Sequence, residues 1–209
     1  MKPQALPAFR NDEDDEEEAC EKNEKADGID PLAQKFLKTR QILLSGEINK
    51  PLAEKIIRQL LVLEADSASD PIKIFIDSPG GDADAGYAIF DMIRFISAPV
   101  YTIGMGLVAS AGSIILLAAP KERRFALPNS HYLIHQPLSG IKGVATEIEI
   151  HAAELEKMRV KINELIACET GLPVDKVSKD TDRDFWMNAS EAKDYNLVAK
   201  VVANRKELP

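Results

Sequence analysis

A serine, a histidine and an aspartate in this sequence stand where they could carry out nucleophilic catalysis. Ser110 lies among small residues just before the apolar run 114–119, so its hydroxyl can face a cleft at the start of a buried helix. His135 closes the apolar stretch 132–134 and precedes a segment rich in proline and glycine. Asp184 ends a charged loop further along the chain. Such a set offers a nucleophile, a base that takes its proton and a carboxylate that orients the base.

The residues alone leave other assignments open. A serine in a small-residue context is more often a packing feature than a nucleophile. His131 and His151 compete with His135 as the base, although His131 would lie at the opposite end of the same strand and His151 on a charged helix face. Two further aspartates of the charged loop cannot be separated from Asp184 by spacing alone.

Two backbone N–H groups are candidates for stabilising a negatively charged oxygen. Ala111 directly follows Ser110, and Gly81 ends a tight turn, S-P-G-G, that comes after the apolar stretch 72–76. Glycine suits a backbone that must turn tightly and approach a substrate closely. The sequence therefore predicts an oxyanion hole formed by the N–H groups of Gly81 and Ala111.

Charge divides the chain into an acidic beginning and a nearly neutral remainder. The 209 residues carry a net charge of −8, and residues 1–30 hold 11 acidic and 4 basic side chains, a net −7. The acidic run 12–18 cannot bury apolar surface, so we expect a disordered tail over 1–28 and one domain over 29–209. A neutral domain does not predict nucleic-acid binding, which requires a basic face.

Other features of the sequence indicate the cellular compartment of the protein. Two cysteines do not make a disulfide framework, and the N-terminus lacks the apolar core of a signal peptide. The longest apolar run is six residues, far short of the roughly 20 that a membrane-spanning helix needs. We therefore expect a cytoplasmic protein that neither enters a membrane nor carries a metal ion or other cofactor.

Strands and helices alternate along the chain, which indicates an α/β fold with crossover connections. We expect strands over 41–44, 72–76, 100–103, 124–126, 132–135 and 197–202, and a turn at the glycines of 104–106. The apolar residues of 146–169 recur at helical spacing. That helix would be roughly 36 Å long, so it should project from the domain or pack against another subunit.

Five blocks of the sequence, in this order, resemble those of the ClpP family, the proteolytic subunits of the Clp protease. The blocks are I-D-S-P-G-G at 76–81, G-L-V-A-S-A-G-S at 106–113, R-F-A-L-P-N-S at 124–130, L-I-H-Q-P at 133–137 and D-T-D-R-D at 180–184. The intervals of 25 residues from Ser110 to His135 and 49 residues from His135 to Asp184 are also those of the family. The resemblance extends from about residue 29 to residue 202.

The resemblance implies a serine endopeptidase whose catalytic triad is Ser110, His135 and Asp184. It also implies that the oxyanion hole is built from Gly81 and Ala111. Many members of the family carry methionine directly after the nucleophile, where this chain has alanine. The pocket wall beside the substrate side chain should therefore be smaller here.

The family further implies a fold and a set of partners. The fold is a crotonase-like spiral of ββα units, and residues 140–168 form a protruding handle helix that pairs two heptameric rings. The rings hydrolyse unfolded proteins delivered by an AAA+ unfoldase of the ClpX, ClpA or ClpC type. The pair Asp182 and Arg183 would reach across the ring interface and link assembly to alignment of the triad.

The beginning of the chain departs from the family pattern, because the acidic segment stands where most members have a hydrophobic loop that contacts the unfoldase. Together with the block F-W-M at 185–187, this is similar to divergent bacterial paralogues that assemble with a second type of subunit. One alternative is therefore a weakly active structural or regulatory subunit of a mixed ring. Another, an acyl-CoA enzyme of the crotonase type, would share the fold but would not need the three triad residues together.

Overall fold

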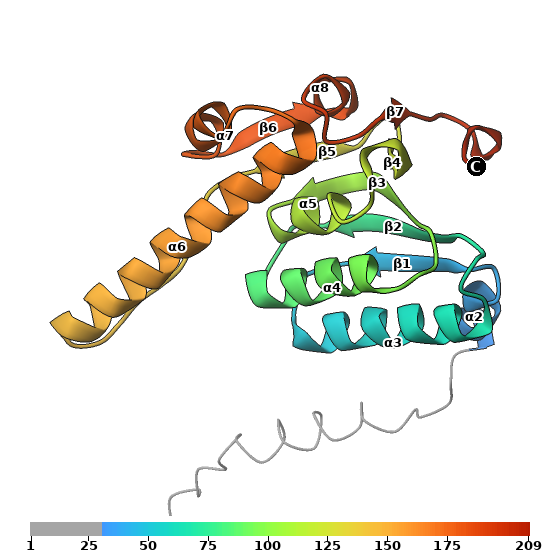
Figure 1. Ribbon diagram of the computed structural model, residues 1–209, viewed down its shortest axis with the longest axis horizontal. Helices are drawn as coiled ribbons and strands as arrows, with labels where there is room; N and C mark the ends of the chain where they lie inside the picture. Colours follow the sequence, from blue (N-terminus) through green and yellow to red (C-terminus); the bar gives the residue numbers. More distant parts are fainter. Residues whose placement is uncertain (1–30) are drawn as a thin grey trace, which may run out of the picture. The chain divides into compact units, whose positions relative to one another are not determined.

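The computed structural model describes residues 31–209 of the chain (Figure 1). It contains two units, residues 1–35 and residues 36–209, and only the last five residues of the first unit are described. The acidic tail expected over residues 1–28 lies outside the described residues. The second unit has the α/β architecture that the sequence predicts, and its elements position the candidate site.

One sheet of seven strands runs through the second unit, and all its pairings are parallel except that of β5 with β6. The order is β1-β2-β3-β4-β7, with β5 pairing with β3 and with β6. The strands are β1 (Gln41–Ser45), β2 (Ile72–Ser78), β3 (Val100–Ala109), β4 (Arg124–Ala126), β5 (His131–Ile134), β6 (Phe185–Asn188) and β7 (Lys200–Val201).

Strand β3 is the branching point of the sheet. Its middle part, from Thr102, pairs with β4, whereas its last residues, Leu107 to Ala109, pair with β5. The end of β3 therefore lies beside the end of β5. Because parallel strands end at the same edge of a sheet, the residues that follow β3 and β5 are brought close together.

The turn expected at 104–106 is wrong, because β3 continues through those residues. The pairing with β2 shifts register between Ile76 and Ser78, and the Asp77 carboxylate accepts a hydrogen bond from the Leu107 N–H at 3.0 Å. The glycines accommodate this irregularity without ending the strand. Strand β6 was not predicted, and the last strand, β7, is shorter than the expected 197–202.

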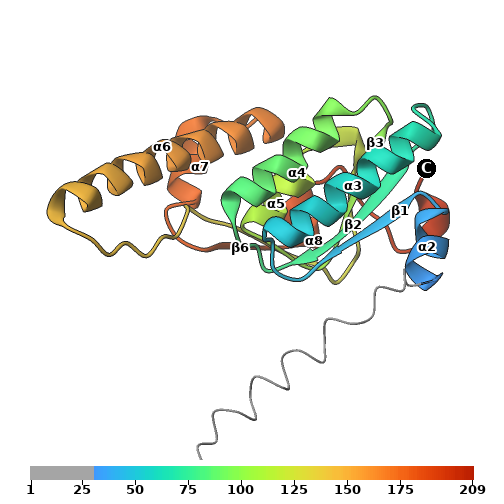
Figure 2. The same ribbon diagram turned by 90° about the horizontal axis from the view of Figure 1, so that it is seen from below.

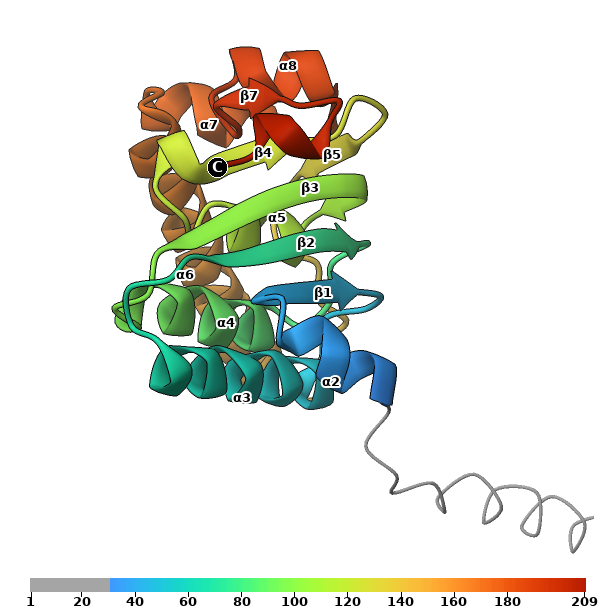
Figure 3. The same ribbon diagram turned by 90° about the vertical axis from the view of Figure 1, so that its right-hand side faces the viewer.

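Helices α3 and α4 cover one face of the sheet (Figures 2 and 3). The β2 residues Ile72, Ile74 and Ile76 are fully buried beneath them, and the alternate residues of β2 are half-buried on the other face. This alternation is the period of two that a strand imposes on its side chains. The helices are α2 (Pro31–Leu37), α3 (Lys50–Asp66), α4 (Ala83–Phe95), α5 (Ala111–Leu116), α6 (Ala145–Thr170), α7 (Val174–Asp180) and α8 (Ala189–Asp194).

Side-chain caps fix where the two covering helices begin. The Asn49 carboxamide accepts a hydrogen bond from the Leu52 N–H at 2.9 Å, at the start of α3. Asp82 accepts from the N–H groups of Asp84 and Ala85 at the start of α4. Each cap satisfies N–H groups that a helix terminus otherwise leaves without partners. The cap of α4 also fixes the turn of the chain that follows β2.

Helix α6 projects away from the sheet (Figure 1). Its buried side chains are confined to its last third, where Ile162, Ile166 and Ala167 pack into the main core. Gly171 follows in the left-handed conformation that commonly ends a helix. The bounds of α6 match the expected helix over 146–169 within one residue at each end. The expected α/β fold with a protruding handle is confirmed.

Candidate active site

Ser110 occupies the single residue between β3 and α5, with a φ of 54° and a ψ of −120°. A non-glycine residue adopts such a conformation only where its surroundings impose it. Here the Ser110 N–H donates to the Leu133 carbonyl at 2.9 Å, and every residue of α5 is buried. The strand and the helix together hold the serine at the sharp turn, with its side chain partly exposed.

The glycine turn after β2 packs directly against this serine. A Cβ on Gly80 would lie 2.6 Å from the Ser110 Cβ and 3.2 Å from its Oγ, so the close approach excludes any side chain there. Gly81, at a φ of 143°, faces the Ile48 backbone, and a Cβ on it would lie 2.2 Å from the Ile48 carbonyl oxygen. Sequence reasoning placed Gly81 near the serine but did not foresee that Gly80 would contact it.

The two candidate oxyanion donors are arranged differently. Gly80 and Asp82 make the hydrogen bonds to Ile48 on either side of Gly81, so the Gly81 N–H is not engaged in this bridge. The Ala111 N–H belongs to the first turn of α5, where N–H groups have no partner within the helix. Both residues line the same cavity as Ser110.

His135 and Asp184 are joined by a hydrogen bond, with the histidine Nδ1 2.9 Å from the aspartate Oδ1. The pairing of β5 with β6 explains how residues 49 positions apart meet. Ile134 pairs with Phe185 at the end of this antiparallel ladder, so His135, which follows Ile134, lies beside Asp184, which precedes Phe185. The His135 side chain is 13% exposed and that of Asp184 is 60% exposed.

The structure separates the alternatives that spacing left open. His131 is exposed at the opposite end of β5, and His151 is exposed on α6. Asp180 lies 2.6 Å from Lys176 and accepts a hydrogen bond from the Tyr195 hydroxyl at 2.8 Å, away from His135. Asp184 is therefore the carboxylate of the charged loop that contacts His135.

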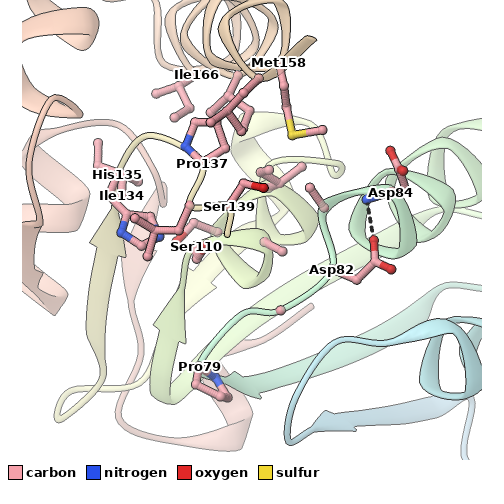
Figure 4. Close-up of a pocket in the computed structure, with 18 residues that line it drawn as sticks. Pro79, Asp82, Asp84, Ser110, Ile134, His135, Pro137, Ser139, Met158 and Ile166 are labelled. Atoms are coloured by element: carbon pink, nitrogen blue, oxygen red, sulfur yellow. Dashed lines mark hydrogen bonds between the residues drawn. The ribbon is translucent and has the colours of Figure 1, made fainter. Parts of the chain in front are cut away.

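A cavity of about 420 Å³ brings Ser110 and His135 to one wall (Figure 4). Its apolar lining comes partly from α6, through Met158, Ile162 and Ile166. Within the described residues, the Ser110 hydroxyl has no hydrogen bond to His135, whose Nδ1 already contacts Asp184. Catalytic hydrogen bonds often tighten only when substrate is bound.

Asp182 and Arg183 lie in the loop just before Asp184. The Arg183 Nε is 4.0 Å from the Asp182 carboxylate, and the two side chains are 89% and 58% exposed. Gln136, which sequence reasoning did not single out, donates from its side-chain amide to the Asp182 carbonyl at 2.7 Å. Its position directly after His135 in the L-I-H-Q-P block was the available signal.

The family model described as Clp protease matches residues 23–205. The chain belongs to the Clp protease family. It is 74% identical over 189 residues to an ATP-dependent Clp protease proteolytic subunit 2 of Treponema denticola, covering 90% of this chain and 94% of that relative. A proteolytic subunit 3 of Rhizobium meliloti is 47% identical, with 96% and 100% covered. A ClpP1 mutant from Listeria monocytogenes has a similar structure, with a TM-score of 0.80, 52% identity, and 85% and 99% covered.

Family membership confirms the predicted function class, because the proteolytic subunits of the Clp protease are serine peptidases. It also removes the acyl-CoA alternative, since the match is to the protease itself over most of the chain. Among residues 31–209, no helix is long and apolar enough to cross a membrane. The same residues contain no group of three or more potential ligand side chains that could hold a metal ion.

Proposed function

We propose that this chain cleaves peptide bonds with Ser110 as the nucleophile, His135 as the general base and Asp184 as the residue that orients the base. The observation that carries the proposal is the 2.9 Å contact between His135 Nδ1 and Asp184, made beside the cavity that Ser110 lines. The strained backbone of Ser110 at the start of α5 adds support, because such strain is stored where a side chain must be presented.

In the proposed mechanism, Asp184 accepts the Nδ1–H of His135, which leaves the lone pair of Nε2 free. Nε2 takes the hydroxyl proton as the Ser110 Oγ attacks the carbonyl carbon of the peptide. The carbonyl oxygen becomes an oxyanion and accepts hydrogen bonds from the N–H groups of Gly81 and Ala111. The histidine then passes its proton to the amine as the C–N bond breaks, and water hydrolyses the acyl-enzyme by the same route.

The cavity supports a substrate that is an unfolded polypeptide with an apolar side chain beside the cleaved bond. Ile114, Met158, Ile162 and Ile166 form its apolar wall. Ala111, which stands where many relatives in the family have methionine, leaves more room beside the nucleophile. A folded protein could not place the backbone of the cleaved bond at Ser110 and at the same time insert the neighbouring side chain into the cavity.

We further propose that the chain works in the cytoplasm within two stacked heptameric rings, of one or two subunit types, served by an AAA+ unfoldase. The relatives' names, which describe subunits of an ATP-dependent protease, support an ATP-hydrolysing partner. The exposed apolar residues of α6, Ile148 among them, support a contact between rings. Asp182 and Arg183 are mostly exposed, which leaves both side chains accessible to a neighbouring subunit.

A second candidate is a weakly active structural or regulatory subunit of a mixed ring. Within the described residues, the lack of a hydrogen bond between the Ser110 hydroxyl and His135 favours it, as does the exposure of Asp184. The two candidates differ in turnover rather than in the residues involved. Turnover of the chain in pure form and together with a second subunit type therefore distinguishes them.

The test compares wild type, Ser110→Ala and Ser190→Ala by labelling with a fluorophosphonate probe and by hydrolysis of a fluorogenic peptide. Ser190 is exposed at the start of α8, outside the cavity. We expect Ser110→Ala to lose labelling and at least about 10³-fold in kcat, whereas Ser190→Ala keeps both. Unchanged turnover in Ser110→Ala would overturn the triad, and labelling with negligible turnover in wild type would favour the regulatory subunit.

A further inference from the structure

Thr181 begins the loop that carries Asp184, and it is buried although it is polar. Its side chain is fully enclosed, at 1% exposure, and its Oγ1 lies 2.7 Å from the Asn163 Oδ1 and 2.9 Å from the Val177 carbonyl. Asn163 belongs to α6 and is itself 4% exposed. A buried polar pair persists because each partner satisfies the other. This pair ties the loop to the buried end of α6.

The same loop is tied to the strand that carries the histidine. The Gln136 N–H donates to the Thr181 carbonyl at 2.7 Å, and the Gln136 side chain donates to the Asp182 carbonyl at 2.7 Å. Gln136 directly follows His135. Two segments thus hold the loop: α6 through Asn163, and the end of β5 through Gln136.

Asp184 has no comparable anchor of its own. Its side chain is 60% exposed, and the hydrogen bond that the structure gives it is the one to His135. The β5–β6 ladder fixes the backbone on the Phe185 side of Asp184. The position of the carboxylate therefore also depends on what fixes the loop on the other side, at Thr181, three residues earlier.

We propose that Asn163 and Thr181 are positioning residues that hold Asp184 in register with His135. The inference rests on the proposed function, because it needs Asp184 to orient the catalytic base. A misplaced carboxylate would leave the imidazole without its fixed tautomer and orientation. Substrate binding in the apolar part of the cavity would be unaffected, so the loss falls on kcat rather than on KM.

The experiment uses the full chain and four variants, with kcat, KM, unfolding in urea and particle size measured for each. Thr181→Val keeps the shape of the side chain and removes the hydroxyl, whereas Thr181→Ser keeps the hydroxyl. The double variant Asn163→Leu with Thr181→Val replaces both partners by apolar groups, which commonly restores stability lost by stranding one partner. Ser110→Ala serves as the reference for the proposed function.

We expect Thr181→Val to lose about 10-fold or more in kcat with KM changed less than about twofold, and Thr181→Ser to stay within about twofold of wild type. The double variant should recover stability and particle size but not kcat. If Thr181→Val does not fold, the double variant carries the comparison with Thr181→Ser.

Recovery of kcat together with stability in the double variant would reduce the pair to a purely structural role and overturn the inference. Wild-type kcat in a folded Thr181→Val would do the same. In both cases an inactive Ser110→Ala would leave the proposed function intact. An active Ser110→Ala would instead overturn the proposed function, and the inference with it.

Discussion

The two parts of α6 have opposite surroundings although they belong to one continuous helix. Residues 145–161 are mostly exposed, and apolar side chains such as Ile148, at 41%, and Ile150, at 64%, face outward. Residues 162–170 include five that are buried, of which Asn163 and Thr170 are polar. Apolar residues make up about half of each part, so tertiary contacts at one end determine which of them are buried.

Ion pairs attach the buried part of α6, residues 162–170, to the rest of the domain. Glu169 forms ion pairs with Arg94 of α4 and with Arg124 of β4. The Arg124 side chain is 1% exposed, and it also donates to the carbonyls of Ala119 and Glu169. Burial lowers the pKa of Arg124 from its ordinary value, and the neighbouring Glu169 carboxylate opposes that shift. The C-terminal end of α6 is thus joined through Arg124 to Ala119, in the segment that follows α5.

Short-range pairs support the exposed part instead. Glu154 pairs with Lys157, and Glu156 pairs with Arg159, each three residues apart on the helix. Such pairs stabilise a helix by only a few tenths of a kcal/mol each. The exposed part therefore depends little on the rest of the chain, which suits a surface that another subunit would cover.

The largest expected effect tests that surface. Ile148→Asp places a charge on the exposed apolar stripe, and we expect the proposed double ring to separate into single rings or monomers because a charge buried without a partner is strongly unfavourable. Ala153→Asp, an exposed site on the opposite face of α6, is the control and should assemble normally. Size-exclusion chromatography with light scattering measures the mass. Normal assembly of Ile148→Asp would show that the stripe is not covered.

A smaller effect is expected at the other end of the helix. Glu169→Gln leaves Arg94 and the buried Arg124 without a counter-charge, which should lower the free energy of unfolding by roughly 3 kcal/mol or more. Glu164→Gln, at an exposed position of the same helix, should change it by less than about 0.5 kcal/mol. Urea unfolding at one protomer concentration provides the comparison. Equal losses in the two variants would remove the distinction between the parts.

Sequence reasoning predicted the features that depend on local pattern. Ser110 and His135 follow apolar stretches that become parallel strands, and the bounds of α6 follow from helical spacing. It did not predict β6, whose four residues include only one buried side chain, Met187, and therefore carry no clear alternation. Because β6 places Asp184 beside His135, spacing could not choose among the aspartates of the loop.

The division of α6 was also beyond the sequence. Its apolar stripe runs through both parts, and only the fold reveals which part meets the core. The contacts that mark the buried part come from side chains far away in sequence, such as Arg94 and Arg124, 75 and 45 residues from Glu169. The pairing of Asn163 with Thr181 is equally non-local. Polar residues that are buried between distant segments give no periodic signal in the sequence that would distinguish them from exposed polar residues.

The smallest expected effect concerns Tyr87, which lies at the boundary between the two parts of α6. Its ring centroid is 4.0 Å from the Nζ of Lys161, the last residue before the buried part, and Tyr87 is 8% exposed. Among the described residues, the Tyr87 hydroxyl has no hydrogen-bond partner. Burial raises the pKa of Tyr87 to about 12, and the nearby carboxylates of Asp84 and Asp91 add to the shift.

A pKa raised above the unfolded value of about 10 means that the folded state holds the phenol proton more tightly. The associated stability is present below pH 10 and is lost as the pH rises through about 12.

Tyr87→Phe removes this loss and the unpartnered hydroxyl but keeps the ring under Lys161. We expect about 1 kcal/mol of added stability at pH 7 and a shallower decline between pH 10 and 12. Part of the decline should remain, because burial also raises the pKa of Tyr132 and of Tyr195. Urea unfolding between pH 7 and pH 12 provides the measurement. If Tyr87→Phe is less stable than wild type and its free energy of unfolding falls as steeply between pH 10 and 12, the hydroxyl has a partner at this boundary.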